Sequence, residues 1–145
     1  IFIVIENKIF VFAVKNFTHL MTIDTDFNPR GLIGINGGQE NTVIAYVKKE
    51  EELEKVKTYL TITHFFSDNK TTDVPISTTE TQFTFLGINN DGTILAVAGE
   101  EGSRIKMYNT KNGTLIQELK SIQENNFNSI LILSYKLNYK IIKLN

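Results

Sequence analysis

The sequence predicts an all-β fold, an incomplete β-propeller built from antiparallel four-stranded blades. Short apolar or alternating runs of Ile, Val, Phe and Tyr recur along the chain, and Gly, Asn and Asp interrupt them. Residues 82–119 contain four such runs joined by three short turns. Four strands in about 40 residues is the repeat length of a propeller blade. With 145 residues in all, the chain is long enough for a single partial propeller domain.

The first expected element is a hairpin at the start of the chain. Residues 1–5 and 8–14 form its two arms, and Glu6-Asn7 forms a tight turn between them. Apolar residues occupy both alternating faces of the second arm, which indicates a strand with neighbours on both sides. We therefore assign residues 1–14 to the end of one blade.

Residues 30–80 are expected to form a second blade. Its strands are predicted at 32–36, 42–47, 56–62 and, less regularly, in a Ser/Thr-rich return at 75–79, with a Gly37-Gly38 turn after the first. The charged run at 48–57 could pair Glu51 with Lys55 on one helical turn. It has one apolar residue before Val56 and hence no helix face to dock, so a solvated loop or hairpin tip is expected.

The third blade, residues 82–121, has the clearest turn signals. Asn and Asp followed by Gly accept the positive φ that tight turns require. The expected strands are 82–88, 93–98, 104–109 and 114–119, with turns at Asn89-Asn90-Asp91-Gly92, Glu100-Glu101-Gly102 and Lys111-Asn112-Gly113.

Residues 128–145 begin a fourth blade. About three and a half blades cannot close a ring, and the chain begins in a strand without Met, so we expect a fragment with exposed sheet edges.

Composition limits the classes of function. The formal net charge of −1 gives no overall field for binding nucleic acid, and the chain has no cysteine for disulfides, thiolate catalysis or cysteine-ligated metals. No apolar run approaches the roughly 18 residues of a transmembrane helix, and no basic region precedes an apolar stretch as in a signal peptide. We therefore expect no nucleic-acid partner and no membrane-spanning segment.

The sequence offers few residues for catalysis. His19 and His64 are far apart, and neither has a carboxylate at a metal-ligand spacing. Asp24 and Asp26 could form a carboxylate pair, but next to Asn28-Pro29 they are expected to hold a turn through bonds to the backbone. We predict that the chain is not an enzyme and holds no metal or cofactor.

Six stretches follow one another along the chain: IENKIFVF at 5–12, NPRGL at 28–32, AY at 45–46, NDGTILA at 90–96, residues 100–108 and residues 113–119. The hairpin, followed at the right distance by the NPRGL loop, is the most selective part, and commoner propeller sequences come after it. In this order the stretches resemble the PROPPINs, seven-bladed phosphoinositide-binding propellers of autophagy. The resemblance is weakest over residues 48–81.

The resemblance implies a scaffold on endosomal or autophagosomal membranes, cytoplasmic and peripherally attached, that recognises phosphatidylinositol 3-phosphate or 3,5-bisphosphate and contacts autophagy scaffold proteins. In the family, an Arg-Arg pair at the end of the fifth blade binds the phosphates of the headgroup. This chain has Lys120 and Ser121 at the matching positions. Ser103 and Lys106 occupy two further family positions. These four residues are the predicted lipid site, and it is degenerate because an ammonium replaces a planar guanidinium and one charge is missing.

A second interpretation stays open. The chain could keep the propeller fold, lose the lipid and act as a protein-interaction scaffold. A general replacement of Arg by Lys would explain Lys106 and Lys120, since the sequence is rich in Ile, Asn and Lys, but it does not explain Ser121.

Overall fold

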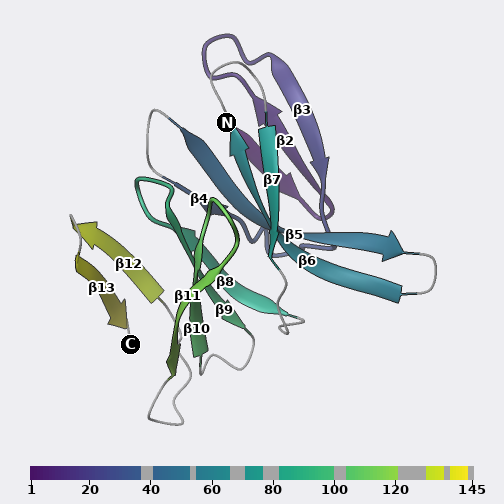
Figure 1. Ribbon diagram of the computed structural model, residues 1–145. Helices are drawn as coiled ribbons and strands as arrows, with labels where there is room; N and C mark the ends of the chain where they lie inside the picture. Colours follow the sequence, from purple (N-terminus) through teal and green to yellow (C-terminus); the bar gives the residue numbers. More distant parts are fainter. Residues whose placement is uncertain are drawn as a thin grey trace.

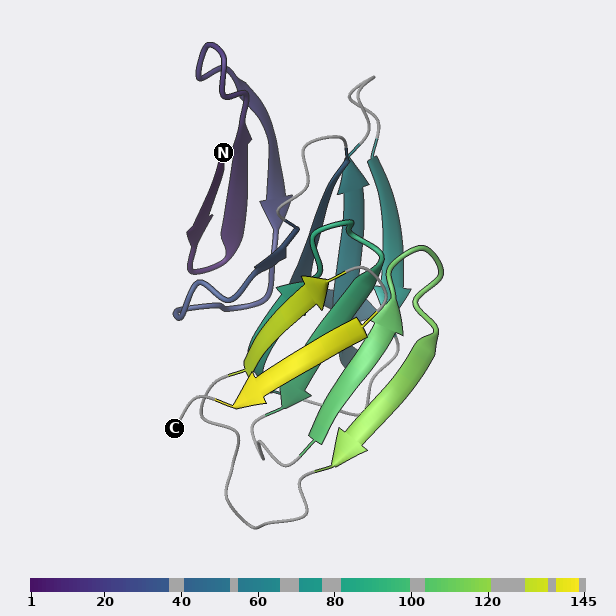
Figure 2. The ribbon, with the colours of Figure 1, turned by 90° about the vertical axis from the view of Figure 1, so that its left-hand side faces the viewer.

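The computed structural model describes residues 1–36, 41–52, 55–65, 71–76, 82–99, 104–120, 130–135 and 138–143. These residues form thirteen strands in four antiparallel sheets. Three sheets stack beside one another, and the last hairpin lies against the third of them (Figures 1 and 2). The fold is therefore all-β and has the architecture of a partial propeller, as the strand periodicity and turn pattern predict. No helix long and apolar enough to cross a membrane occurs among the described residues.

The first sheet has the order β1 (Phe2–Ile5), β2 (Lys8–Phe12) and β3 (His19–Asp24). The predicted hairpin is present, with Ile5 paired to Lys8 across the Glu6-Asn7 turn. The sequence analysis did not predict β3. Its residues are mostly exposed and polar or mixed, so its amphipathic alternation is weak, and it pairs with β2 after a bulge.

The second sheet has the order β4 (Gly34–Ile35), β5 (Thr42–Glu52), β6 (Lys55–Phe65) and β7 (Thr71–Ile76). The charged run lies within a hairpin, and the backbone ladder continues to the pair Glu52–Lys55. The two strands are thus longer than predicted, and the helical alternative at Glu51 and Lys55 is wrong. Strand β7 also lies earlier than the return predicted at 75–79. The Gly37-Gly38 turn lies outside the described residues.

The third sheet has the order β11 (Leu115–Lys120), β10 (Arg104–Asn109), β9 (Ile94–Gly99) and β8 (Phe83–Ile88). Its strands lie within one residue of the predicted bounds. Gly92 and Gly113 have φ of +74° and +69°, the left-handed conformation that the predicted turns require. The turn predicted at Glu100-Glu101-Gly102 lies outside the described residues. The fourth sheet is the hairpin β12 (Ile130–Tyr135) and β13 (Asn138–Lys143).

Apolar side chains fill the two junctions between the three stacked sheets. Ile9 and Val11 of the first sheet pack with Ile44 and Tyr46 of the second. Between the second and third sheets lies the largest cluster, whose buried members are Val43, Ala45, Leu60, Ile62, Ile76, Phe83, Leu86, Leu95, Val97 and Tyr108. The strands β4, β8 and β12 come first in sequence in the second, third and fourth sheets. Strand β4 contacts β8, and β8 contacts β12, so these three first strands lie side by side. This face-to-face packing of successive sheets is typical of propeller blades.

Candidate functional site

The pairing of β10 with β11 decides where the predicted basic residues lie. Arg104 is opposite Lys120, and Lys106 is opposite Glu118. Because side chains in a strand alternate between faces, these four residues share one face of the sheet. Lys106 and Lys120 are diagonal neighbours across the two strands, and the Cα atoms of such a pair lie about 7–8 Å apart in typical antiparallel geometry. The structure therefore brings together these two predicted residues, whereas Ser103 and Ser121 lie outside the described residues.

The same face carries a carboxylate that the sequence analysis did not include in the site. Glu118 Oε1 lies 3.5 Å from Arg104 Nη1, and the two side chains are 27% and 51% exposed. This oxygen is buried and accepts no hydrogen bond in the described structure, so the pair is an ionic contact rather than a well-formed hydrogen bond. Three cationic residues therefore share this face with one anion, which lowers the positive potential available to a phosphate.

Arg104 and Glu118 could be placed beside the predicted lysines only with knowledge of the hairpin register. Arg104 and Lys106 alternate on one strand, and Glu118 and Lys120 alternate on the next, separated by the Asn112-Gly113 turn. Such alternation places all four on one face once the register is known. A bulge between Met107 and Tyr108 shifts that register, and the sequence alone gave no sign of it.

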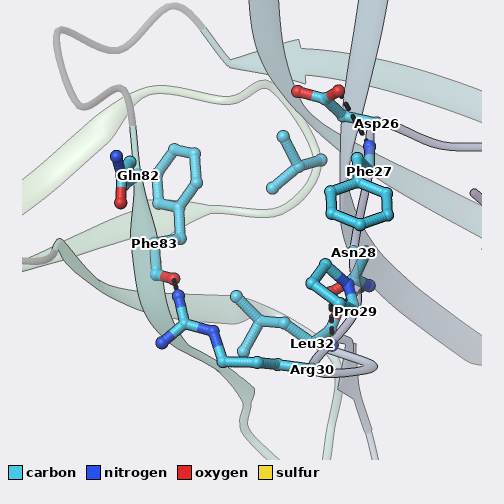
Figure 3. Close-up of a pocket in the computed structure, with 9 residues that line it drawn as sticks. Asp26, Phe27, Asn28, Pro29, Arg30, Leu32, Gln82 and Phe83 are labelled. Atoms are coloured by element: carbon cyan, nitrogen blue, oxygen red, sulfur yellow. Dashed lines mark hydrogen bonds between the residues drawn. The ribbon is translucent and has the colours of Figure 1, made fainter. Parts of the chain in front are cut away.

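The NPRGL sequence forms a loop that joins all three stacked sheets. Asn28 fixes it internally, because its Oδ1 accepts a hydrogen bond from Leu32 N at 2.8 Å and its Nδ2 donates to Leu32 O at 2.9 Å. Gly31 follows with φ of +62°. Arg30 then reaches across to the third sheet, where its Nη2 donates to Phe83 O at 3.0 Å (Figure 3). This contact spans 53 residues, so no local pattern in the sequence could predict it.

A pocket of about 350 Å³ lies beside this loop. Figure 3 shows it between the loop on one side and Gln82 and Phe83 on the other. Its remaining lining residues are Asp26, Phe27, Asn28, Pro29, Arg30, Leu32 and Val47. The sequence analysis singled out the NPRGL stretch but did not predict a pocket there.

His64, Asp24 and Asp26 make contacts that stabilise the fold. His64 Nε2 lies 2.8 Å from Thr110 O, a distance at which the ring nitrogen must donate because a carbonyl only accepts. Asp26 Oδ1 accepts a hydrogen bond from Phe27 N at 2.8 Å, which is the expected turn role. Asp24 instead pairs with Lys8 at 3.3 Å. No group of three or more His, Asp or Glu residues that could hold a metal occurs in the described part of the chain.

A chain of hydrogen bonds on the second sheet runs from the buried side chains of Tyr46 and Thr63 to the exposed Asp73. Thr63 Oγ1 donates to Asp73 Oδ1 at 2.6 Å, so Tyr46, whose hydroxyl lies 3.2 Å from Thr63 Oγ1, must be the donor in that second bond. Burial raises the pKa of the Tyr46 hydroxyl, the Thr63 hydrogen bond opposes that rise, and the Asp73 charge adds to it. Tyr46 is therefore neutral at physiological pH and acts as a donor in the core.

Two comparisons find proteins that are similar to this chain. It is 22% identical over 147 residues to autophagy-related protein 18 of Komagataella pastoris, which covers 81% of this chain and 27% of that protein. The fold matches KlAtg21 in a solved complex with the coiled coil of AgAtg16, with a TM-score of 0.66, 16% identity and coverage of 89% of this chain and 42% of that one. No family model matches the chain.

These similarities establish the fold and support a distant relation to the PROPPINs. The chain spans about a quarter of the length of the Atg18 relative and less than half of the KlAtg21 chain.

Proposed function

We propose that the chain is part of a PROPPIN-like propeller that binds the headgroup of phosphatidylinositol 3-phosphate or 3,5-bisphosphate and contacts autophagy scaffold proteins. It would act in the cytoplasm, attached peripherally to endosomal or autophagosomal membranes. The observation that carries the proposal is the register of β10 and β11, which puts Lys106 and Lys120 on one face as diagonal neighbours. Ser103 and Ser121, each one residue beyond a described strand, complete the proposed site.

The proposed binding is weak and sensitive to salt. Lys120 is exposed, so added salt screens its attraction for phosphate. An ammonium is a single point charge, whereas the family's arginine offers a planar fork with two parallel donors. The Glu118 carboxylate on the same face further opposes an anion.

Liposome flotation of the complete protein tests this proposal. Vesicles containing phosphatidylinositol 3-phosphate are compared with vesicles of phosphatidylcholine alone. We expect Lys120→Ala to weaken binding and Ser121→Arg to strengthen it by adding a charge-assisted contact, roughly tenfold if the contact is worth about 1.4 kcal/mol. Lys111→Ala is the matched control, because Lys111 is an exposed lysine at the opposite, turn end of the same hairpin.

The second candidate function is a protein-interaction scaffold without lipid binding. The observation that favours it is Glu118, which neutralises part of the basic face by pairing with Arg104. The KlAtg21 structure, a complex with a coiled coil, shows that a protein of this fold binds another protein. If neither the parent protein nor the Ser121→Arg variant floats with the vesicles, the lipid proposal is wrong and the scaffold is the better account.

A further inference from the structure

The pocket beside the NPRGL loop is held in shape by contacts to several elements. Thr25 N donates to Asn7 O and Asp26 N donates to Val47 O, both at 2.9 Å, which ties the loop to the first and second sheets. The Arg30 bond to Phe83 O ties it to the third. A loop fixed at three places loses little conformational entropy when a ligand binds, so the pocket is preorganised.

The pocket has apolar side chains along its walls and a charged side chain at each of two ends. Leu32, Val47 and Phe83 form much of the wall, and Phe27 stands beside it with 69% of its surface exposed. Figure 3 shows the Asp26 carboxylate and the Arg30 guanidinium at opposite ends of the lining.

Both charged groups keep capacity for a ligand. The hydrogen bond from Phe27 N uses only Oδ1 of Asp26, and the bond to Phe83 O uses only one guanidinium nitrogen of Arg30. The second carboxylate oxygen and the remaining guanidinium donors make no hydrogen bond among the described residues. An aromatic side chain exposed beside such a pocket is typical of protein-binding sites.

We propose that this pocket binds a short extended segment of a partner protein, in which an apolar side chain lies between a basic and an acidic residue. The apolar side chain fills the wall formed by Leu32, Val47 and Phe83. The basic residue pairs with Asp26 and the acidic residue with Arg30. The Asp26 carboxylate repels phosphate, so a phosphoinositide headgroup is a poorer occupant than such a peptide. None of the lining residues belongs to the proposed lipid face on β10 and β11.

The test uses a phage library of random heptapeptides selected on the complete protein, followed by fluorescence anisotropy of the enriched peptides. We expect enriched sequences to carry an apolar residue between opposite charges. Asp26→Asn keeps an acceptor for Phe27 N but removes the charge, and Arg30→Gln removes the other charge. Each should weaken binding about three- to tenfold, the range expected for a partly exposed charged contact.

Matched controls separate binding from folding. Phe27→Ala removes an exposed ring and should weaken binding without lowering the unfolding midpoint, whereas Phe17→Ala, which is 70% exposed in another loop, should change neither. Asp24→Asn is the control for Asp26→Asn, because Asp24 lies outside the pocket lining. Failure to enrich any peptide, or equal binding by the parent and the Asp26→Asn and Arg30→Gln variants, would overturn the proposal. Lipid flotation of these pocket variants should equal that of the parent, so the two proposals can fail separately.

Discussion

Alanine at Gly92 should destabilise the protein more than alanine at Gly31, although both glycines have φ in the left-handed region, +74° and +62°. At Gly31 an added Cβ meets nothing within 4 Å, so the substitution is opposed by backbone conformation alone, about 1–2 kcal/mol. At Gly92 the same atom would lie 2.9 Å from Val43 Cγ2 and 3.2 Å from Asn36 Nδ2.

The neighbours of Gly92 cannot move away easily. Asn36 Nδ2 donates to Asn41 O at 2.7 Å and its Oδ1 accepts from Val43 N at 2.8 Å, and Val43 is buried in the core. The Gly92 carbonyl itself accepts a hydrogen bond from Thr110 Oγ1 at 2.5 Å, which fixes the turn from the other side. Overpacking in such a site typically costs about 1–3 kcal/mol, so with the backbone cost Gly92→Ala should lose about 2–5 kcal/mol in all.

Urea unfolding followed by far-ultraviolet circular dichroism measures both variants against the parent. The difference between the two losses isolates the steric contribution, because the backbone contribution and the change in unfolded-state entropy are similar for both. We expect Gly92→Ala to be less stable than Gly31→Ala by about 1–3 kcal/mol. Equal losses would refute the reasoning, because they would mean that the contacts with Val43 and Asn36 relax without cost.

Three further predictions concern the core and the sheet edge. Ile62→Ala, at a fully buried position, should lower the free energy of unfolding by about 2–5 kcal/mol, whereas Leu115→Ala, at a position 52% exposed, should lower it much less; comparable losses in urea unfolding would contradict this. Tyr46→Phe should lose about 1 kcal/mol at pH 7. Because the folded pKa is raised above the ordinary value of 10.0, the contribution of Tyr46 holds below pH 10 and is lost as pH rises through the folded pKa, so the variant should lose less stability than the parent between pH 7 and 11. Ile3 is 47% exposed on the edge strand β1, so Ile3→Lys should reduce self-association of the isolated chain in sedimentation velocity, and an unchanged distribution of species would argue against an exposed-edge mechanism.

The sequence predicted strands best where turn chemistry and alternation agree. In the third sheet, Asp91-Gly92 and Asn112-Gly113 mark turns between apolar strands, and the structure follows those signals. In the second sheet, the charged run was expected to be a solvated loop or hairpin tip because it has no apolar face for a helix to dock. It does lie in a hairpin, but backbone pairing continues through it to Glu52 and Lys55. Strand β3 was missed because only Met21 and Ile23 pack against the core, both of them partly buried, and its other side chains are exposed.

The candidate site was predictable only in part. Alternation groups Lys106 with Arg104 on β10 and Lys120 with Glu118 on β11, but the bulge between Met107 and Tyr108 decides that the two groups share one face. The Arg30 contact with Phe83 depends on how one sheet packs on the next, which is a tertiary property that sequence periodicity does not contain.

The hydrogen-bonded ladders have a consequence for how such a chain can change during evolution. Every ladder in the described structure joins strands that follow one another in the sequence. A stretch of gene that encodes one sheet can therefore be duplicated, lost or exchanged without rerouting a ladder in any other sheet. After such a change, only the sheet faces that newly pack on each other must adapt by mutation. These faces are apolar, and apolar cores tolerate substitution when the total side-chain volume is kept.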